Sequence, residues 1–257
     1  MDLKNATHDG HAVLYHYQSF NACYLERTLR DRTIHMAKPS EFNDPWDCRP
    51  WFDATDLDDP DEREKILQWI CRTDPLEDIE ELRRDTEQLR AMVTVTHLFH
   101  VKTVSDVYRV YCLTPDPLHP LMWSHYGGGH KGIALEFDAT TPQMQYAFGV
   151  SYRETYPPIR MYEEGGSTDL VPIYTKSDVW EYEHEYRLVG EERTSALSDK
   201  PPHGVPMVFE SNLRLMPGVL TGVVLGCRCD EPLAMELIDA YGPDLRVHPR
   251  NASPDRW

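Results

Sequence analysis

The stretch VYRVYCLTPDPLHPLMWSHYGGGHKGIALEF, residues 107–137, decides the fold class. Its two ends, Val107–Leu113 and Gly132–Phe137, have the apolar and aromatic composition of β-strands, and a glycine-rich segment lies between them. Similar short runs follow at Gly149–Tyr152, Glu185–Val189, Val205–Phe209 and Leu220–Leu225. Most are bounded by Gly or Pro and are too closely spaced for helical crossovers, so we expect a largely antiparallel sheet.

Helices are expected at both ends of the chain. Residues 12–17 read as a first strand, Asn21 can cap a helix carrying Leu25 and Leu29, and residues 33–37 read as a second short strand. Leu233–Tyr241 is expected to be the last helix, followed by a tail from Pro249 that frays. The class is therefore α+β, with helices flanking the sheet.

The length of 257 residues fits a single domain spanning residues 1–257. After an acidic stretch from Asp53 to Asp61, apolar residues recur at helical spacing around Ile66–Ile70 and from Leu76 to Val93. No Gly/Ser-rich linker flanks this region. We expect a helical insertion at about 53–105, packed on one side of the sheet.

The charge balance restricts the classes of partner. Lys and Arg total 26 against 43 Asp and Glu, a formal net charge of -17, which disfavours duplex nucleic acid and anionic membranes. No run of 18 apolar residues and no signal peptide is present, so we expect a cytoplasmic protein without a membrane partner. The six dispersed cysteines predict reduced thiols, and their spacing predicts no metal site.

The densest group of functional side chains is Trp123-Ser124-His125-Tyr126, followed by three glycines and His130. The rings supply stacking faces, the histidines can transfer protons, and the glycine backbone can approach a ligand closely. The alternative is a glycine-rich turn with a buried Trp anchor. The segment lacks the Gly-Lys-Ser/Thr order of a nucleotide P-loop.

A second group is Lys176 followed by residues 180–189, Trp-Glu-Tyr-Glu-His-Glu-Tyr-Arg-Leu-Val. If this segment is extended, Glu181, Glu183, Glu185 and Arg187 share one face, because side chains alternate along a strand. Lys176, Arg187 or a basic ligand could neutralise the carboxylates. Crowding could also raise the pKa of one carboxyl group toward the value of a general base. The alternative is a solvated acidic strand edge with Arg187 in a structural salt bridge.

A third group joins Tyr15-His16-Tyr17 on the first strand with Asn43-Asp44-Pro45. Asn and Asp before Pro favour a fixed turn, so we expect a structural role in this loop for Asn43 and Asp44. For His16 a satisfied core histidine and a functional role are both open.

These segments in this order resemble the bacterial family known as domain of unknown function 2971, over about residues 13–190. The resemblance is carried by Leu14-Tyr15-x-Tyr17, Ser40–Pro45, Met122–Tyr126 with His130-Lys131-Gly132, and Lys176 with Trp180–Arg187. The chain departs from the family pattern at His16 and Gln18, where basic residues are usual.

The order of motifs is also similar, more distantly, to that of ADP-ribosyltransferases. This resemblance implies NAD as substrate, with His16 and Tyr17 in the NAD-binding motif, Tyr126 or Trp123 stacking on nicotinamide and Ser124 in support. It implies Glu185 as the essential carboxylate with Glu183 assisting. His125, His130, Lys176 and Arg187 complete the residues that we expect to bind the substrate.

Three functions follow as hypotheses. The first is an NAD-consuming ADP-ribosyltransferase-like or NAD glycohydrolase-like enzyme that acts on a small-molecule nucleotide. The sequence does not identify the acceptor, and the kind of family that the chain resembles suggests a toxin or phage-defence role. The second is a non-catalytic sensor or binding module, in which Trp123, Tyr126 and His130 line a ligand pocket and the acidic face binds a basic protein. The third is a hydrolase or nuclease that uses Asp44, Glu183 and Glu185 with a divalent ion.

Overall fold

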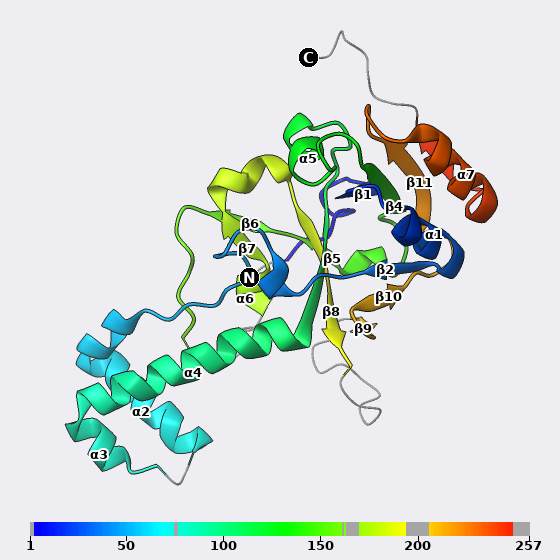
Figure 1. Ribbon diagram of the computed structural model, residues 1–257. Helices are drawn as coiled ribbons and strands as arrows, with labels where there is room; N and C mark the ends of the chain where they lie inside the picture. Colours follow the sequence, from blue (N-terminus) through cyan, green and yellow to red (C-terminus); the bar gives the residue numbers. More distant parts are fainter. Residues whose placement is uncertain (1–2, 75–76, 161, 163–169, 194–205, 249–257) are drawn as a thin grey trace. The chain divides into compact units, whose positions relative to one another are not determined.

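The computed structural model describes residues 3–74, 77–160, 162, 170–193 and 206–248 (Figure 1). The fold is α+β, as predicted. The chain forms two compact units: the first comprises Met1–Lys38, Tyr108–Ser151 and Val179–Trp257, and the second comprises Pro39–Val107 and Tyr152–Asp178. The helices expected at 53–105 lie in the second unit.

The first unit contains a four-stranded sheet in the order β1-β4-β11-β12. Its strands are β1 Val13–Gln18, β4 Ile133–Asp138, β11 Leu220–Leu225 and β12 Arg246–His248. β4 pairs antiparallel with both β1 and β11, whereas β12 pairs parallel with β11. The strand register places Tyr15 opposite Glu136, and Glu136 opposite Gly222.

A second sheet of this unit has the order β3-β8-β5, with β9 paired to β8. Its strands are β3 Tyr108–Leu113, β8 Tyr186–Glu192, β5 Ala147–Gly149 and β9 Met207–Val208. β8 is antiparallel to β3 and β5 and parallel to β9. A smaller antiparallel pair joins β2 Thr33–His35 to β10 Asn212–Arg214. The prediction of largely antiparallel pairing is confirmed.

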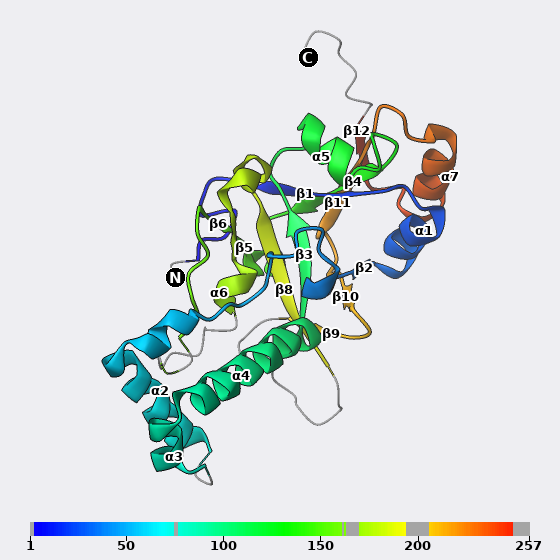
Figure 2. The same ribbon diagram turned by 60° about the vertical axis from the view of Figure 1, so that its left-hand side comes forward.

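Helices cover the first sheet on both faces (Figures 1 and 2). Alternation directs Leu14, Leu135 and Val223 into a core shared with α1 Ala22–Asp31 and α7 Glu231–Tyr241. The side chain of Asn21 accepts from the Tyr24 amide and begins α1, as predicted. The opposite face packs against the short helix α5 Pro120–His125.

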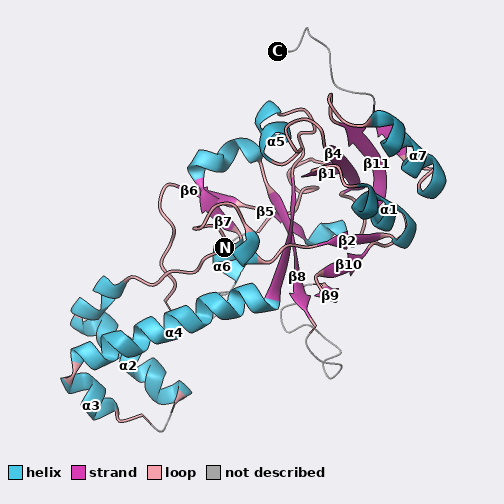
Figure 3. Ribbon diagram, viewed as in Figure 1, coloured by secondary structure: helices cyan, strands magenta, loops and turns pink. Residues whose placement is uncertain are grey.

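The second unit is mainly helical (Figure 3). It contains η1 Pro39–Glu41, η2 Ala54–Asp58, α2 Pro60–Thr73, α3 Ile79–Arg84, α4 Thr86–Val107, α6 Leu170–Ile173 and β7 Thr175–Ser177. It also contains Tyr152 and Arg153 of β6 Ser151–Arg153, the strand that pairs with β7. Leu67, Ile70, Leu89 and Val93 recur at helical spacing because they form one buried cluster. Within the described part of the chain, none of the helices has the length and hydropathy needed to cross a membrane.

Two local expectations were wrong. The run Gly149–Tyr152 is divided between β5 and β6, because β5 pairs with β8 and β6 pairs with β7. The segment from residue 180 is not extended throughout, because η4 Asp178–Glu183 turns the aromatic side chains toward α5 before β8 begins. Leu76, Val205 and the tail from Pro249 lie outside the described residues.

Candidate functional site

Trp123 anchors α5 to the first sheet. Its ring is 5% exposed and meets the Tyr17 ring edge-on, with 4.8 Å between centroids. Its Nε1 donates to the Pro117 carbonyl at 3.0 Å, and the Tyr17 hydroxyl donates to the Asp116 carbonyl at 2.8 Å. Burial, together with the negative charge of Asp116, raises the pKa of Tyr17. Both aromatic residues therefore fix α5 and the loop before it against β1.

The glycine-rich loop folds back onto α5. The amides of Gly127 and His130 donate to the carbonyls of Met122 and Trp123, and Gly132 donates to Gly127. Gly128 and Gly129 have φ of 58° and 63°, in the left-handed region that glycine adopts without penalty. The amides of Gly127, His130 and Gly132 thus stabilise the turn and are not directed at a ligand.

Five partly or fully exposed rings form an aromatic cluster, defined as His119, His125, Tyr126, Trp180 and Tyr182. His125 meets Tyr126 and Trp180 at centroid distances of 6.2 and 6.4 Å. Trp180 lies 6.1 Å from Tyr182, which stacks on His119 at 5.3 Å and an angle of 21°. Residues from α5 and η4 therefore share one accessible surface.

Glu183 lies beside this cluster. Its side chain is 2% exposed, and its Oε1 accepts a hydrogen bond of 2.8 Å from the Tyr126 hydroxyl. This contact links the Trp-Ser-His-Tyr motif to the Glu-rich motif across 57 residues of sequence. Nearby, Ser124 Oγ and His130 Nε2 are 3.2 Å apart at the surface.

Glu185 and Arg187 form a buried ion pair. Arg187 is 0% exposed and Glu185 is 4% exposed. The guanidinium contacts both carboxylate oxygens, with Nε at 2.7 Å from Oε1 and Nη2 at 3.1 Å from Oε2. Such two-point contact fixes both planar groups in one orientation.

His16 faces the other side of β1 from Tyr15 and Tyr17. Its ring stacks on Tyr111 at 3.9 Å, and its Nδ1 lies 2.8 Å from the Cys112 carbonyl. Burial lowers the pKa of His16 to about 4, although the carbonyl contact opposes the shift. The structure does not bring His16 into the aromatic cluster.

The remaining predicted residues belong to the second unit. Lys176 on β7 forms a buried ion pair with Asp47, with 3.8 Å between Nζ and Oδ2. Asp44 Oδ1 accepts from the Trp46 amide at 2.9 Å, a turn contact, and Asn43 lies in the same loop. Among the described residues, no group of three or more His, Cys, Asp or Glu side chains could hold a metal ion.

The model of the family described as Protein of unknown function (DUF2971) matches residues 122–188. The matched segment begins in α5 and ends in β8, so it includes Tyr126, Glu183, Glu185 and Arg187. Searches of curated proteins and of solved structures gave no match.

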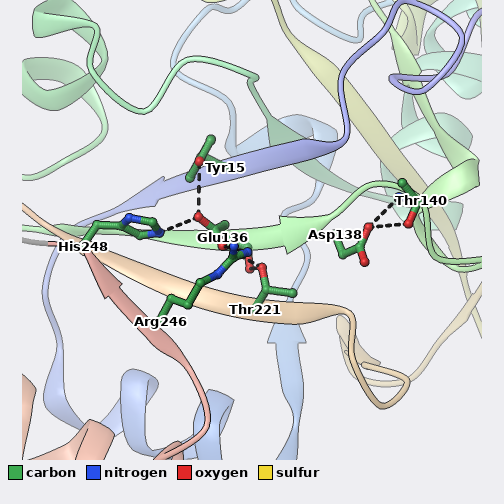
Figure 4. A network of polar contacts seen from close by, with 7 residues as sticks. All are labelled: Tyr15, Glu136, Asp138, Thr140, Thr221, Arg246 and His248. Atoms are coloured by element: carbon green, nitrogen blue, oxygen red, sulfur yellow. Dashed lines mark hydrogen bonds and ion pairs between the residues drawn. The ribbon is translucent and has the colours of Figure 1, made fainter.

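Sequence reasoning missed a polar network around Glu136, on the same face of the first sheet as Tyr15 (Figure 4). Glu136 is 2% exposed. Its Oε1 accepts from Thr221 at 2.8 Å and Arg246 at 2.5 Å, and its Oε2 lies 3.2 Å from the Tyr15 hydroxyl and 2.6 Å from His248 Nε2. The one available signal was a charged residue within the apolar run 133–137.

The partners of Glu136 determine its protonation. Burial alone would raise the pKa of Glu136, but the Thr221 hydroxyl and the positive charges of His248 and Arg246 hold it below its ordinary value. Burial is the main cause that raises the pKa of Tyr15 to about 12, and the charge of Glu136 is the second cause. Glu136 is thus an ionised carboxylate enclosed by donors.

Proposed function

We propose that the chain is an NAD-consuming enzyme of the ADP-ribosyltransferase-like or NAD glycohydrolase-like kind, acting at the aromatic cluster and Glu183. The observation that carries the proposal is the 2.8 Å hydrogen bond from Tyr126 to Glu183, which joins an aromatic motif to a carboxylate motif. Both motifs lie within the segment matched by the family model.

The chemistry suits such a site. The nicotinamide ring of NAD is cationic, and aromatic faces and carboxylates both attract a cation. When the bond from ribose C1′ to the nicotinamide nitrogen breaks, its electron pair leaves with nicotinamide and positive charge develops on the ribose. A fixed carboxylate stabilises that charge. Water or an acceptor side chain then bonds to C1′ and loses a proton.

Roles follow from the contacts. Tyr126 is partly exposed, whereas Trp123 is buried edge-on against Tyr17, which supports Tyr126 as the stacking ring. Glu183 is the carboxylate in contact with Tyr126, and we assign it the charge-stabilising role. Glu185 is held at two points by Arg187, and we assign this pair the role of positioning the segment that carries Glu183.

The test is nicotinamide release from NAD by the purified protein, with and without cell lysate as a source of acceptor. We expect Glu183→Gln to lower the rate by about 100-fold or more, as for loss of one transition-state contact. Glu181→Gln is the matched control, since Glu181 lies exposed two residues earlier in η4, and it should retain full activity.

Two further variants separate the roles. Tyr126→Phe should lower the rate less than Glu183→Gln, because the ring is kept and only the hydroxyl is lost. Glu185→Gln should change the rate together with the KM for NAD if it positions the site. Absence of release by the native protein with lysate present, or full activity in a folded Glu183→Gln variant, would refute the proposal.

A non-catalytic ligand-sensing module is the second candidate. Glu183 is enclosed whereas His125 is exposed and Tyr126 partly exposed, an arrangement that lets a cationic ligand bind the rings without reaction at the carboxylate. It predicts a raised melting temperature with nicotinamide or NAD, since ligand binding stabilises the native state, and no release of product.

A further inference from the structure

A pocket in the first unit shares none of its lining residues with the aromatic cluster. It lies where the end of α1, the turn from β10 to β11 and the segment before β12 meet. Its volume of about 890 Å³ is within the range of small-molecule pockets. Nothing in the proposed function uses it.

The charge of this pocket is opposite to that of the chain. Arg32, Arg214 and Arg246 line it, with Asp244 as the acidic lining residue, although the whole chain has a net charge of -17. Arg32 and Arg214 form no ion pair with any residue that the structure describes. A positively charged pocket in an acidic protein attracts an anion selectively.

The third arginine is already oriented. Arg246 reaches from β12 to the buried carboxylate of Glu136, which also accepts from the pocket-lining Thr221 (Figure 4). The Glu136 contact uses one of the five N–H donors of the guanidinium. A side chain held in place before binding loses less conformational entropy when a ligand arrives.

The rest of the wall is aliphatic. Leu215 and Leu220 are buried lining residues, Met216 is 52% exposed, and Leu245 is partly buried. No aromatic ring is among the residues that line this pocket in the described part of the chain. The walls therefore suit a flexible aliphatic body more than a stacked planar one.

We propose that this pocket binds a small organic anion. A carboxylate or phosphate head group contacts Arg32, Arg214 and Arg246, and an aliphatic body packs on Leu215, Met216 and Leu245. Arginine favours these head groups because its planar donors match their oxygens.

Calorimetric titration of the purified chain at low ionic strength tests the proposal with four probes: decanoate, decyl phosphate, inorganic phosphate and decyltrimethylammonium. At least one of the two amphiphilic anions should bind, and the better of them identifies the head group. Their affinity should exceed those of inorganic phosphate, which lacks the aliphatic body, and of the cationic amphiphile.

Matched charge reversals locate the site. Arg214→Glu should weaken binding of the anion by about tenfold or more, the effect of one charge-assisted hydrogen bond. Arg228→Glu makes the same change on the exposed surface of this unit, outside the pocket, and should leave affinity unchanged. No binding of either anion, equal binding of the cation or of inorganic phosphate, or equal weakening in both variants would overturn the proposal.

Discussion

Replacing Glu136 by Gln tests whether the network in Figure 4 stabilises the first unit. Glutamine keeps the shape of the side chain, and its oxygen can still accept from Thr221 and Arg246. Its amide nitrogen would stand where Oε2 now lies, 2.6 Å from His248 Nε2. The change therefore removes a charge with little change in volume.

The expected loss in the free energy of unfolding is about 1–2 kcal/mol. Hydrogen bonds to a charged group contribute about 1.5–3 kcal/mol each, compared with about 0.5–1.5 kcal/mol for neutral ones. The lower end of the range for charged groups applies because the side chains of Arg246 and His248 are 61% and 38% exposed. Water can therefore replace part of the hydrogen bonding that these side chains lose.

The effect should depend on pH in a defined direction. The pKa of Glu136 is lowered in the folded state, so its stabilisation is present above its unfolded pKa, about 4.3, and is lost as pH falls through the folded value. The difference between native protein and variant should be full at pH 7 and smaller at about pH 3.

Urea unfolding followed by circular dichroism measures this difference, and hydrogen exchange of the β4 amides assigns it to the first unit. Glu236→Gln, on the exposed side of α7, is the control and should change stability by less than about 0.5 kcal/mol. A Glu136→Gln loss no larger than the control, or a loss equal at both pH values, would refute the reasoning.

Three other changes have defined outcomes. Gly132→Ala would place a Cβ 2.1 Å from the Gln18 carbonyl oxygen and should lower the free energy of unfolding by about 3 kcal/mol, as measured by thermal unfolding. In Gly129→Ala the new Cβ meets no atom within 4 Å, so only the φ of 63° is unfavourable and the loss should be about 1 kcal/mol. His16 has a folded pKa of about 4, below its ordinary 6.5, so stability should fall by up to about 3 kcal/mol as pH drops between these values. Urea unfolding at about pH 7 and about pH 4.5 should show that His16→Asn loses less stability between these pH values than the native protein does. An unchanged dependence of stability on pH would contradict this. Trp123→Ala should cost about 3–5 kcal/mol and reduce the near-ultraviolet dichroism, and a well-folded variant of native stability would show that α5 is not anchored by this ring.

Much of the fold could be predicted because its signals are local. The runs at 107–113, 132–137 and 220–225 became β3, β4 and β11 with small shifts at their ends. Asn21 caps α1 as its side chain allows. Alternation and capping depend on residues only a few positions apart, so they are visible in a sequence.

Where two local patterns were possible, tertiary contacts determined the local conformation. Trp180 and Tyr182 fit the alternation of a strand, but ring contacts with His125 and His119 hold them in η4. The sequence named Tyr126 and Glu183 as candidates without showing that they meet.

Glu136 shows most clearly what could not be predicted from the sequence. Its partners come from β1, β11 and β12, up to 121 residues away, and it reads in sequence as one charge within an apolar strand. The sequence by itself determined the α+β class, most of the strand and helix positions and the residue types available for chemistry. Only the tertiary structure decided which carboxylate meets which donor, because strand register and helix packing, set by burial over the whole unit, bring distant side chains within hydrogen-bonding distance.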